Sequence, residues 1–509
     1  MASTGNHSPA RHLVFTETDE VDNATATYIY SQSKPTSDAA NQGRVDISFP
    51  STVTPSSWST RSLLNYLIDV FLPAGYPHSV TDDYLQYQIF DSLQAFCSSI
   101  AGLLSSRAVL QGVGVGNASA SPTSALLLHI LQDSSGRIAT ILFAHRVGTA
   151  LEPECKMYRL AADVFNDLAM ILDCLSPLIP AGVSRVSVLS AAGVLRALCG
   201  VAGGSSKASL SAHFAKWGNL AEVNAKDSSQ ETIISLVGML VGSIVVSRVT
   251  SFAATWISLI LLLILHLSMN YAAVRAVHMT SLNRQRANIV FSTMLASDPD
   301  LRLDGKGLVK LKETSQSQKL NLWTTLSPKE TASRERIFER DGVLRWTAGP
   351  SAQGTSTRLG SCRIGVSLHD LLQDVSSRTT SGSLRTVFPL TRLTSLFSSE
   401  LYILFLTYGR GSDIRATIVL KKDCTGKYQL KAWAHALLAA RVLSSSLSSE
   451  NSTSNEETET ILCILSETLA FLNDGSRFER FINALSDVGW NMSTSALETR
   501  PGRRVQIGS

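Results

Sequence analysis

The feature that most constrains the fold is an apolar run from Val249 to Val274 that contains no Asp, Glu, Lys or Arg. As a helix rising about 1.5 Å per residue, it is long enough to cross the ~30 Å hydrocarbon core of a bilayer. Helices in soluble proteins average only ~10–14 residues, so a buried helix pair in a large soluble protein is the less favoured alternative. The sequence therefore predicts an integral membrane protein with the lipid bilayer as a partner.

A second apolar segment, Thr232–Ser247, precedes the long run and is separated from it by Arg248. As a helix this segment covers only ~24 Å, which is short of the hydrocarbon core. Gly238 and Gly242 within it form a GxxxG pair, which lets two helices approach closely but is weak evidence when isolated. We therefore predict a helical hairpin whose second arm spans the membrane and whose first arm enters only partway or thins the bilayer.

Basic residues gather at one end of this hairpin. Arg275, Arg284 and Arg286 follow the long run with no acidic residue among them. In a hairpin, Lys216 and Lys226 lie on the same side, whereas the far turn carries one arginine. Because Lys and Arg accumulate on the side of a membrane where they need not be translocated, we expect the C-terminal region on the cytosol-like face.

The periodicity of the remaining text indicates a mainly α fold: a helical membrane-associated bundle followed by a smaller α+β C-terminal domain. The expected parts are a β appendage, partly disordered, at residues 1–60; the helical domain at 61–291; a linker at 292–340; and the α+β domain at 341–509, with a disordered insert at 444–459. In the first long helix, apolar and polar side chains recur on different faces: Leu85, Ile89, Leu93 and Phe96 against Gln86, Gln88, Asp91 and Gln94.

Composition excludes several classes of protein. Only 17% of the residues are charged, against ~25% in an ordinary soluble domain, which again favours a membrane protein. There is no dense Lys/Arg tract, so nucleic acid is not an expected partner. The seven scattered cysteines form no CxxC pair, which argues against a disulfide framework and a zinc site. The acidic N-terminal segment lacks the apolar region of a cleaved secretory signal, and its acids argue against a transit peptide.

The glycines Gly112, Gly114 and Gly116 form a GVGVG segment after helical text. Glycines ahead of a helix can cradle phosphate, but a dinucleotide-binding unit needs GxGxxG preceded by a strand. A sharp bend between two helices is the favoured use of these glycines.

Arg159, Asp163 and Asp167 form an i, i+4, i+8 row on one predicted helix. An ordinary i, i+4 ion pair of Arg159 with Asp163 within one helix is the favoured interpretation. In a membrane, however, ionisable side chains are costly and line cavities or substrate routes, so a transport route lined by Asp163, Asp167 and Arg196 is the alternative. The ten histidines show no metal-ligand spacing, and no catalytic motif is present, so neither a metal site nor catalytic residues are expected.

The stretch from Phe71 to Gly116, FLPAGYPHSVTDDYLQYQIFDSLQAFCSSIAGLLSSRAVLQGVGVG, resembles the root UVB sensitive family, also called the vitamin B6 photoprotection and homoeostasis family. The resemblance continues through YRLAADVFNDLAMILDCLSP, HFAKWGNLAEVNAKDSSQET and NYAAVRAVHMTSLNRQR, and covers roughly 60–290. One departure is His145, where relatives often have a bulky aromatic residue.

The resemblance implies a membrane-associated protein without established enzymatic activity. Plant members are linked to ultraviolet-B sensing in roots, early seedling growth, auxin transport and vitamin B6 balance, and some are in plastids. The family supplies no agreed catalytic residues, and pyridoxal phosphate enters only by association, because the sequence offers no recognisable lysine beside a phosphate cup. We favour a non-enzymatic protein of small-molecule homeostasis, which associates with itself or a paralogue. A small-molecule transporter is the second hypothesis, and an enzyme acting at the membrane is the third.

Overall fold

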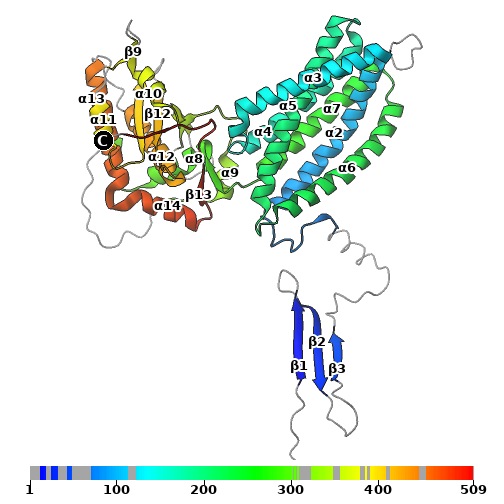
Figure 1. Ribbon diagram of the computed structural model, residues 1–509, viewed down its shortest axis with the longest axis horizontal. Coiled ribbons are helices and arrows are strands. Elements are labelled where there is room, and N and C mark those ends of the chain that lie inside the picture. The colour runs from blue at the N-terminus through cyan, green and yellow to red at the C-terminus, as the bar shows by residue number, and fades with distance from the viewer. Residues whose placement is uncertain are drawn as a thin grey trace, which may run out of the picture. The chain divides into compact units, whose positions relative to one another are not determined.

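The computed structural model describes residues 12–18, 24–32, 43–48, 70–112, 122–301, 303–304, 307–308, 323–347, 356–378, 384–386, 390–408, 413–445 and 454–507. The chain falls into two compact units, one made of Met1–Tyr84 with Ser211–Ile234 and the other of Leu85–Leu210 with Ser235–Ser509. The fold class predicted from the sequence is confirmed: a helical bundle is followed by a smaller α+β region (Figure 1).

The first unit contains the expected β appendage. Strands β1 (His12–Thr18), β2 (Ala24–Gln32) and β3 (Gly43–Ser48) form an antiparallel sheet in the order β1-β2-β3. The central strand pairs through Thr27 with Thr16 on one side and with Ser48 on the other. All three strands expected from the alternating β-branched and aromatic residues are therefore present.

A compact turn in the same unit carries the start of the family-like motif. Gly75 has φ +71°, and a Cβ there would collide with the ring of Trp217, so only glycine fits. The neighbouring Ala74 N–H donates to Glu222 at 2.7 Å, and His213 Nε2 lies 3.0 Å from Asp83 Oδ2. The motif residues are thus held by the backbone and side chains of Ser211–Ile234.

Long helices make up the bundle (Figure 1): α2 (Tyr84–Gly112), α3 (Pro122–Val147), α4 (Cys155–Leu175), α5 (Val183–Phe214), α6 (Leu220–Arg248) and α7 (Phe252–Ala276). Short 3-10 turns follow two of them, at Gly148–Ala150 and Ser176–Leu178. Within the described residues, α2, α5, α6 and α7 are long and apolar enough to cross a membrane.

The bundle is apolar on its outside. Large apolar side chains with more than a third of their surface exposed recur along α6 and α7: Leu236, Val237, Leu240, Ile244, Ile257, Leu261 and Ile264. Helix α2 exposes Leu85, Ile89 and Leu93 in the same way. Contiguous apolar surface of this extent is rare on soluble monomers, and lipid covers it without cost.

The predicted hairpin is present, formed by α6 and α7. The expectation of a short first arm is wrong, because α6 starts at Leu220 and its 29 residues reach ~43 Å. The helix also includes the polar residues before Thr232, which have sufficient helix propensity although they lie outside the apolar segment. At the turn, Arg107 of α2 caps the end of α6 by donating to the carbonyls of Val246 (2.8 Å) and Val249 (2.7 Å).

A mixed five-stranded sheet forms the centre of the C-terminal region. Its strand order is β11-β12-β8-β7, with β14 pairing β12: β7 (Val343–Thr347), β8 (Ser356–Ile364), β11 (Tyr402–Tyr408), β12 (Ile414–Lys421) and β14 (Arg504–Val505). The largest helix packed on this sheet is α12 (Gly426–Ser445), which is buried through most of its length.

Smaller elements complete this region: β4 (Ser281–Asn283), α8 (Arg284–Ser297), β5 (Leu303–Asp304), β6 (Gly307–Leu308), α9 (Pro328–Arg334), α10 (Leu368–Val375), β9 (Ser376–Arg378), β10 (Leu384–Thr386), α11 (Leu390–Leu396), α13 (Ser454–Asn473), η4 (Asp474–Ser476), α14 (Arg477–Asp487) and β13 (Asn491–Ala496). Parallel pairing of β13 with β4 joins the C-terminal segment to the chain that leaves α7.

Two boundaries differ from the expected ones. Helix α8 runs across the expected start of the linker at 292, and its Val290, Phe291 and Met294 are fully buried in the core of the C-terminal region. The polar composition hid this because the helix also buries polar side chains, among them Asn288, Ser292 and Thr293. Part of the expected linker, 309–322, lies outside the described residues. Of the expected insert, 446–453 lies outside them, whereas α12 ends at Ser445 and α13 begins at Ser454.

Candidate functional site

A buried polar cluster lies inside the helical bundle, on α4. Arg159, Asp163 and Asp167 occupy one face of this helix, as their spacing predicts, and each is at least nine-tenths buried. The structure brings them together with polar side chains of α2 and α7. The predicted i, i+4 pair of Arg159 with Asp163 is present, and it is buried because the row faces two neighbouring helices and not solvent.

Arg159 anchors one end of the cluster. Its Nη2 lies 2.5 Å from Asp91 Oδ1 of α2, and its Nη1 lies 3.5 Å from Asp163 Oδ1. Its Nε also donates to the hydroxyl of Tyr87 at 3.3 Å. One guanidinium thus neutralises carboxylates from two helices, which a planar five-donor group can do and an ammonium cannot do as well.

Gln94 of α2 occupies the centre of the cluster. Its Nε2 lies 2.8 Å from Asp163 Oδ2 and 2.7 Å from His266 Nε2 of α7. Asn270, one turn further along α7, also donates to Asp163 through Nδ2. Asp163 is therefore bound by α2, by α7 and by Arg159 of its own helix.

His266 links Asp163 to Asp167. Its Nδ1 lies 2.7 Å from Asp167 Oδ1, and its Nε2 lies 2.7 Å from Gln94 Nε2 and 3.6 Å from Asp163 Oδ2. The cluster holds the three carboxylates of Asp91, Asp163 and Asp167 against the guanidinium of Arg159 and the imidazole of His266.

Arg196 does not join this cluster. It pairs with Asp173, two turns further along α4, and Asp173 also accepts from Ser105 at 2.8 Å. The Arg196 side chain is half exposed, whereas Asp173 is buried. A single route lined by Asp163, Asp167 and Arg196 is thus not what the structure assembles.

Gly112 ends α2. Its carbonyl accepts from Arg185 Nη1 at 2.5 Å, and a Cβ at this glycine would lie 3.1 Å from Ser176 Oγ. A helix C-terminus presents carbonyl groups and the negative end of the helix dipole, which repels phosphate. Gly112 therefore serves close packing, whereas Gly114 and Gly116 lie outside the described residues.

The three arginines that suggested membrane sidedness have protein partners. Arg284 pairs with Asp341, and Arg286 Nη1 lies 2.8 Å from Glu335 Oε1; both arginines are buried. Arg275 donates to three carbonyl groups at the C-terminal end of α9. Their structural role is thus to fasten the end of the bundle to the C-terminal region, and the expected sidedness stays a prediction.

Glu335 is the centre of that fastening. It is buried between Arg286 of α8 and Lys156 of α4, and both form ion pairs with it. Burial raises the pKa of the Glu335 carboxyl, but Lys156 and Arg286 outweigh burial and hold its pKa below the ordinary range. For the nearby Glu154, burial prevails over the attraction of Arg286 and Arg284 and raises the pKa to about 7.

Metal binding has no visible basis in the parts of the chain that the structure describes: no three His, Cys, Asp or Glu side chains are grouped to hold an ion. The carboxylates of the cluster are instead engaged with Arg159, Gln94, Asn270 and His266.

Several members of the cluster are not recognised from the sequence. His266 stands alone in apolar text, and Tyr87, Asp91 and Gln94 belong to what looks like the solvent face of an amphipathic helix. The structure buries that polar stripe and exposes Leu85, which is the arrangement of a helix in lipid. The sequence therefore contains a signal for the buried cluster: polar residues at helical spacing along one side of α2, beside apolar residues along another.

Comparisons with known proteins match two parts of the chain. Residues 57–298 match the family model described as the vitamin B6 photo-protection and homoeostasis domain, and residues 355–500 match the model for the C-terminal part of root UVB sensitive proteins. No solved structure is significantly similar.

Among individual proteins, RUS family member 1 of Dictyostelium discoideum is 46% identical over 231 residues, which are 45% of this chain and 44% of that protein. Protein root UVB sensitive 3 of Arabidopsis thaliana is 36% identical over 261 residues, 51% of this chain and 57% of that protein. Protein root UVB sensitive 2, chloroplastic, of the same plant is 27% identical over 248 residues, 48% of this chain and 56% of that protein. The matched part of the chain thus spans about half the length of these relatives.

Proposed function

Because the chain belongs to the root UVB sensitive family, we propose that it is an integral membrane protein acting, without catalysing a reaction, in homeostasis of vitamin B6 or a related small molecule. The observation that carries the membrane part is the polarity of the bundle, which buries Arg159, Asp163 and His266 and exposes Leu240 and Ile257. A soluble protein has the opposite polarity. The vitamin B6 part rests on the description of the matched family model.

A role without catalysis is supported by how the cluster uses its polar groups. Arg159, Gln94 and Asn270 spend their donors on carboxylates and carbonyl groups of the same bundle. Polar contacts of this kind hold helices together where the hydrophobic effect is absent. The bundle is then a rigid membrane scaffold that presents its other surfaces to partners.

A combined assay tests this proposal. Cells lacking the chain should show altered pools of vitamin B6 vitamers, and the wild-type chain should restore them. The purified chain in detergent should convert neither pyridoxal nor pyridoxal phosphate, and its titration with pyridoxal phosphate should leave the absorbance band of the free aldehyde unshifted. Unaltered vitamer pools would refute the homeostasis role, and a converted vitamer would refute the absence of catalysis.

A transporter is the second candidate, and the charge of the cluster favours it. Three carboxylates that share one guanidinium and one histidine inside an apolar bundle favour the binding of a proton or a cation. Asp167 is the carboxylate best placed to bind a cation or proton. Its partner in the cluster is His266, whereas Asp163 has four partners. A cation or proton that binds at Asp167 and is released would couple the site to movement of a solute.

Uptake of pyridoxal into proteoliposomes separates the two candidates. If the chain is a transporter, proteoliposomes should accumulate more pyridoxal than empty liposomes do. The Asp167→Asn variant, inserted to the same level, should lose this uptake. A scaffold should give no uptake. The organelle, and association of the chain with itself or a paralogue, stay predictions; the name of one relative assigns that relative to the chloroplast.

A further inference from the structure

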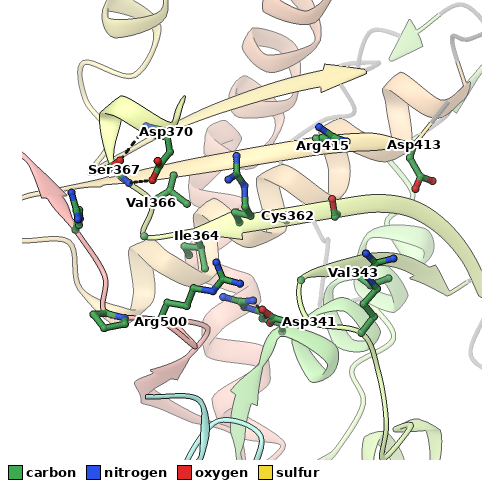
Figure 2. A pocket seen from close by; sticks show the side chains of 18 of the residues that line it. Asp341, Val343, Cys362, Ile364, Val366, Ser367, Asp370, Asp413, Arg415 and Arg500 are labelled. Carbon is green, nitrogen blue, oxygen red and sulfur yellow. Dashed lines mark hydrogen bonds and ion pairs between the residues drawn. The ribbon is translucent and has the colours of Figure 1, made fainter. Parts of the chain in front are cut away.

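A recess of about 440 Å³ opens on the C-terminal α+β region (Figure 2). It is lined by strands β8 and β12, by the loop that precedes β7 and by the segment that follows Thr499. Its volume falls within the ~300–1,000 Å³ of small-molecule sites. The recess shares no residue with the buried cluster, which lies within the helical bundle.

The lining of the recess is strongly cationic. It contains three aspartates, Asp341, Asp370 and Asp413, against seven arginines, an excess of four positive charges: Arg284, Arg340, Arg358, Arg363, Arg415, Arg500 and Arg503. The whole chain has a net charge of only +4, so this one recess concentrates a charge equal to that of the entire protein.

The aspartates already have partners. Asp341 pairs with Arg284, and Asp413 Oδ2 lies 2.7 Å from Arg358 Nη2. Asp370 Oδ2 accepts from the N–H of Ser367 at 3.4 Å, in the turn before α10. None of the three is therefore available to neutralise the remaining arginines.

Arg363 also has an interaction partner, so four guanidinium groups are left over: those of Arg340, Arg415, Arg500 and Arg503. In the ranges that the structure describes, their side chains make no hydrogen bond, ion pair or ring contact. They come from three separate places, the loop before β7, strand β12 and the C-terminal segment. Like charges gathered at one point repel each other, so the recess attracts anions, and a bound anion would stabilise the arrangement.

The backbone fixes the elements that carry these arginines. Gly342 has φ +72°, and a Cβ there would lie 2.5 Å from Cys362 O; the close approach lets Cys362 N–H donate to Gly342 O at 2.6 Å. On the other side of β8, Arg503 N–H donates to Gly365 O at 2.9 Å. Arg415 stands on β12 opposite Ser361 of β8, in the parallel part of the sheet. The recess is thus built from strand backbone and pinned loops.

We propose that this recess binds a small phosphate-bearing anion, a phosphomonoester or a diphosphate. Guanidinium groups present paired donors that match two oxygens of one phosphate, and phosphate dianions supply the charge that four unpaired arginines require. The phosphate belongs either to a free metabolite or to a lipid headgroup. This inference goes beyond the proposed function and does not depend on it, because it concerns a different part of the chain.

The probe is inorganic pyrophosphate, titrated by calorimetry into the full chain in nanodiscs of phosphatidylcholine. Saturable binding is expected, together with a loss of affinity of at least tenfold in the double variant Arg415→Gln/Arg500→Gln. Both arginines are exposed and unpaired, so the variant should fold, and an unchanged melting temperature verifies this. The matched control is Arg392→Gln, which removes an exposed arginine paired with Glu459 outside the recess and should leave binding unchanged.

The same measurement in nanodiscs that also contain phosphatidic acid identifies the source of the phosphate. If phosphatidic acid suppresses the binding of pyrophosphate, the site takes a lipid headgroup; if binding is unchanged, it takes a free phosphate compound. Either result supports an anion site. The proposal is overturned if the wild-type chain shows no saturable binding, or if Arg392→Gln weakens binding as much as the double variant.

Discussion

Asp163 on α4 and His266 on α7 share the amide of Gln94, whose Nε2 lies 2.8 Å from the carboxylate and 2.7 Å from the imidazole. Three helices that are apolar outside are thereby joined by polar side chains inside. Without these contacts the bundle would bury unsatisfied polar groups, so the contacts both specify and stabilise it.

Loss of the central cation should destabilise the bundle strongly. We expect Arg159→Gln to lower the free energy of unfolding by about 3–5 kcal/mol, because it leaves Asp91 and Asp163 buried without a positive partner. Thermal unfolding of the purified chain in detergent measures the effect. The control is Arg137→Gln. It removes an exposed i, i+4 pair with Asp133 and should change the free energy of unfolding by less than about 0.5 kcal/mol. Equal melting temperatures for the two variants would contradict this account.

The GxxxG pair of α6 should prove a packing site. A Cβ on Gly238 would lie 2.8 Å from Ser99 Cβ and 3.1 Å from Phe96 O of α2, so Gly238→Ala must separate the two helices. We expect it to lower the melting temperature in detergent. Gly200→Ala on α5 is the matched control: no atom lies within 4 Å of its added Cβ, and helix propensity should make it neutral or stabilising by up to about 1 kcal/mol. A stable Gly238→Ala variant would show that α2 and α6 do not pack as described.

The fold class, the apolar hairpin and the row on α4 could be predicted from the sequence, because they depend on local composition and on the spacing of residues along a helix. It could not show which face of α2 is buried, since the same amphipathic pattern serves a helix in water and a helix in lipid, with opposite faces inward. The partners of Arg284 and Arg286 were equally hidden. Asp341 and Glu335 lie about fifty residues away in sequence, and only the tertiary fold brings them near.

The junction at Glu335 should be sensitive to the loss of its charge. Glu335→Gln leaves Lys156 and Arg286 buried without a carboxylate, and we expect it to cost about 3–5 kcal/mol near neutral pH. Because the native pKa of Glu335 is lowered, its stabilisation is present above the unfolded-state pKa of about 4.3 and is lost as the pH falls through the native value. The difference between wild type and variant in chemical denaturation should therefore shrink on acidification. A difference that does not change with pH would refute the ion pairs.

The C-terminal region should lose stability in weak acid through His435. Burial lowers the pKa of this histidine to about 3, and its ring lies 3.0 Å from the Tyr402 hydroxyl and 2.9 Å from Thr468 Oγ1. The unfolded chain takes up a proton below pH ~6.5 and the native one does not, so stability falls between that pH and about 3. Fluorescence-detected unfolding should show a loss of about 2 kcal/mol from pH ~6.5 to ~5. His435→Gln should remove this part of the pH dependence, and an unchanged slope would contradict the prediction.

The most direct test of the whole account asks whether lipid covers the outside of the bundle. Membranes from cells expressing the full chain are washed with alkaline carbonate, which strips peripheral proteins and leaves integral ones. With apolar residues such as Leu240 and Ile257 facing hydrocarbon, the chain should stay entirely in the membrane pellet and enter solution only with detergent. Release of folded chain into the carbonate supernatant would contradict the membrane assignment and, with it, the inside-out polarity on which the proposed function depends.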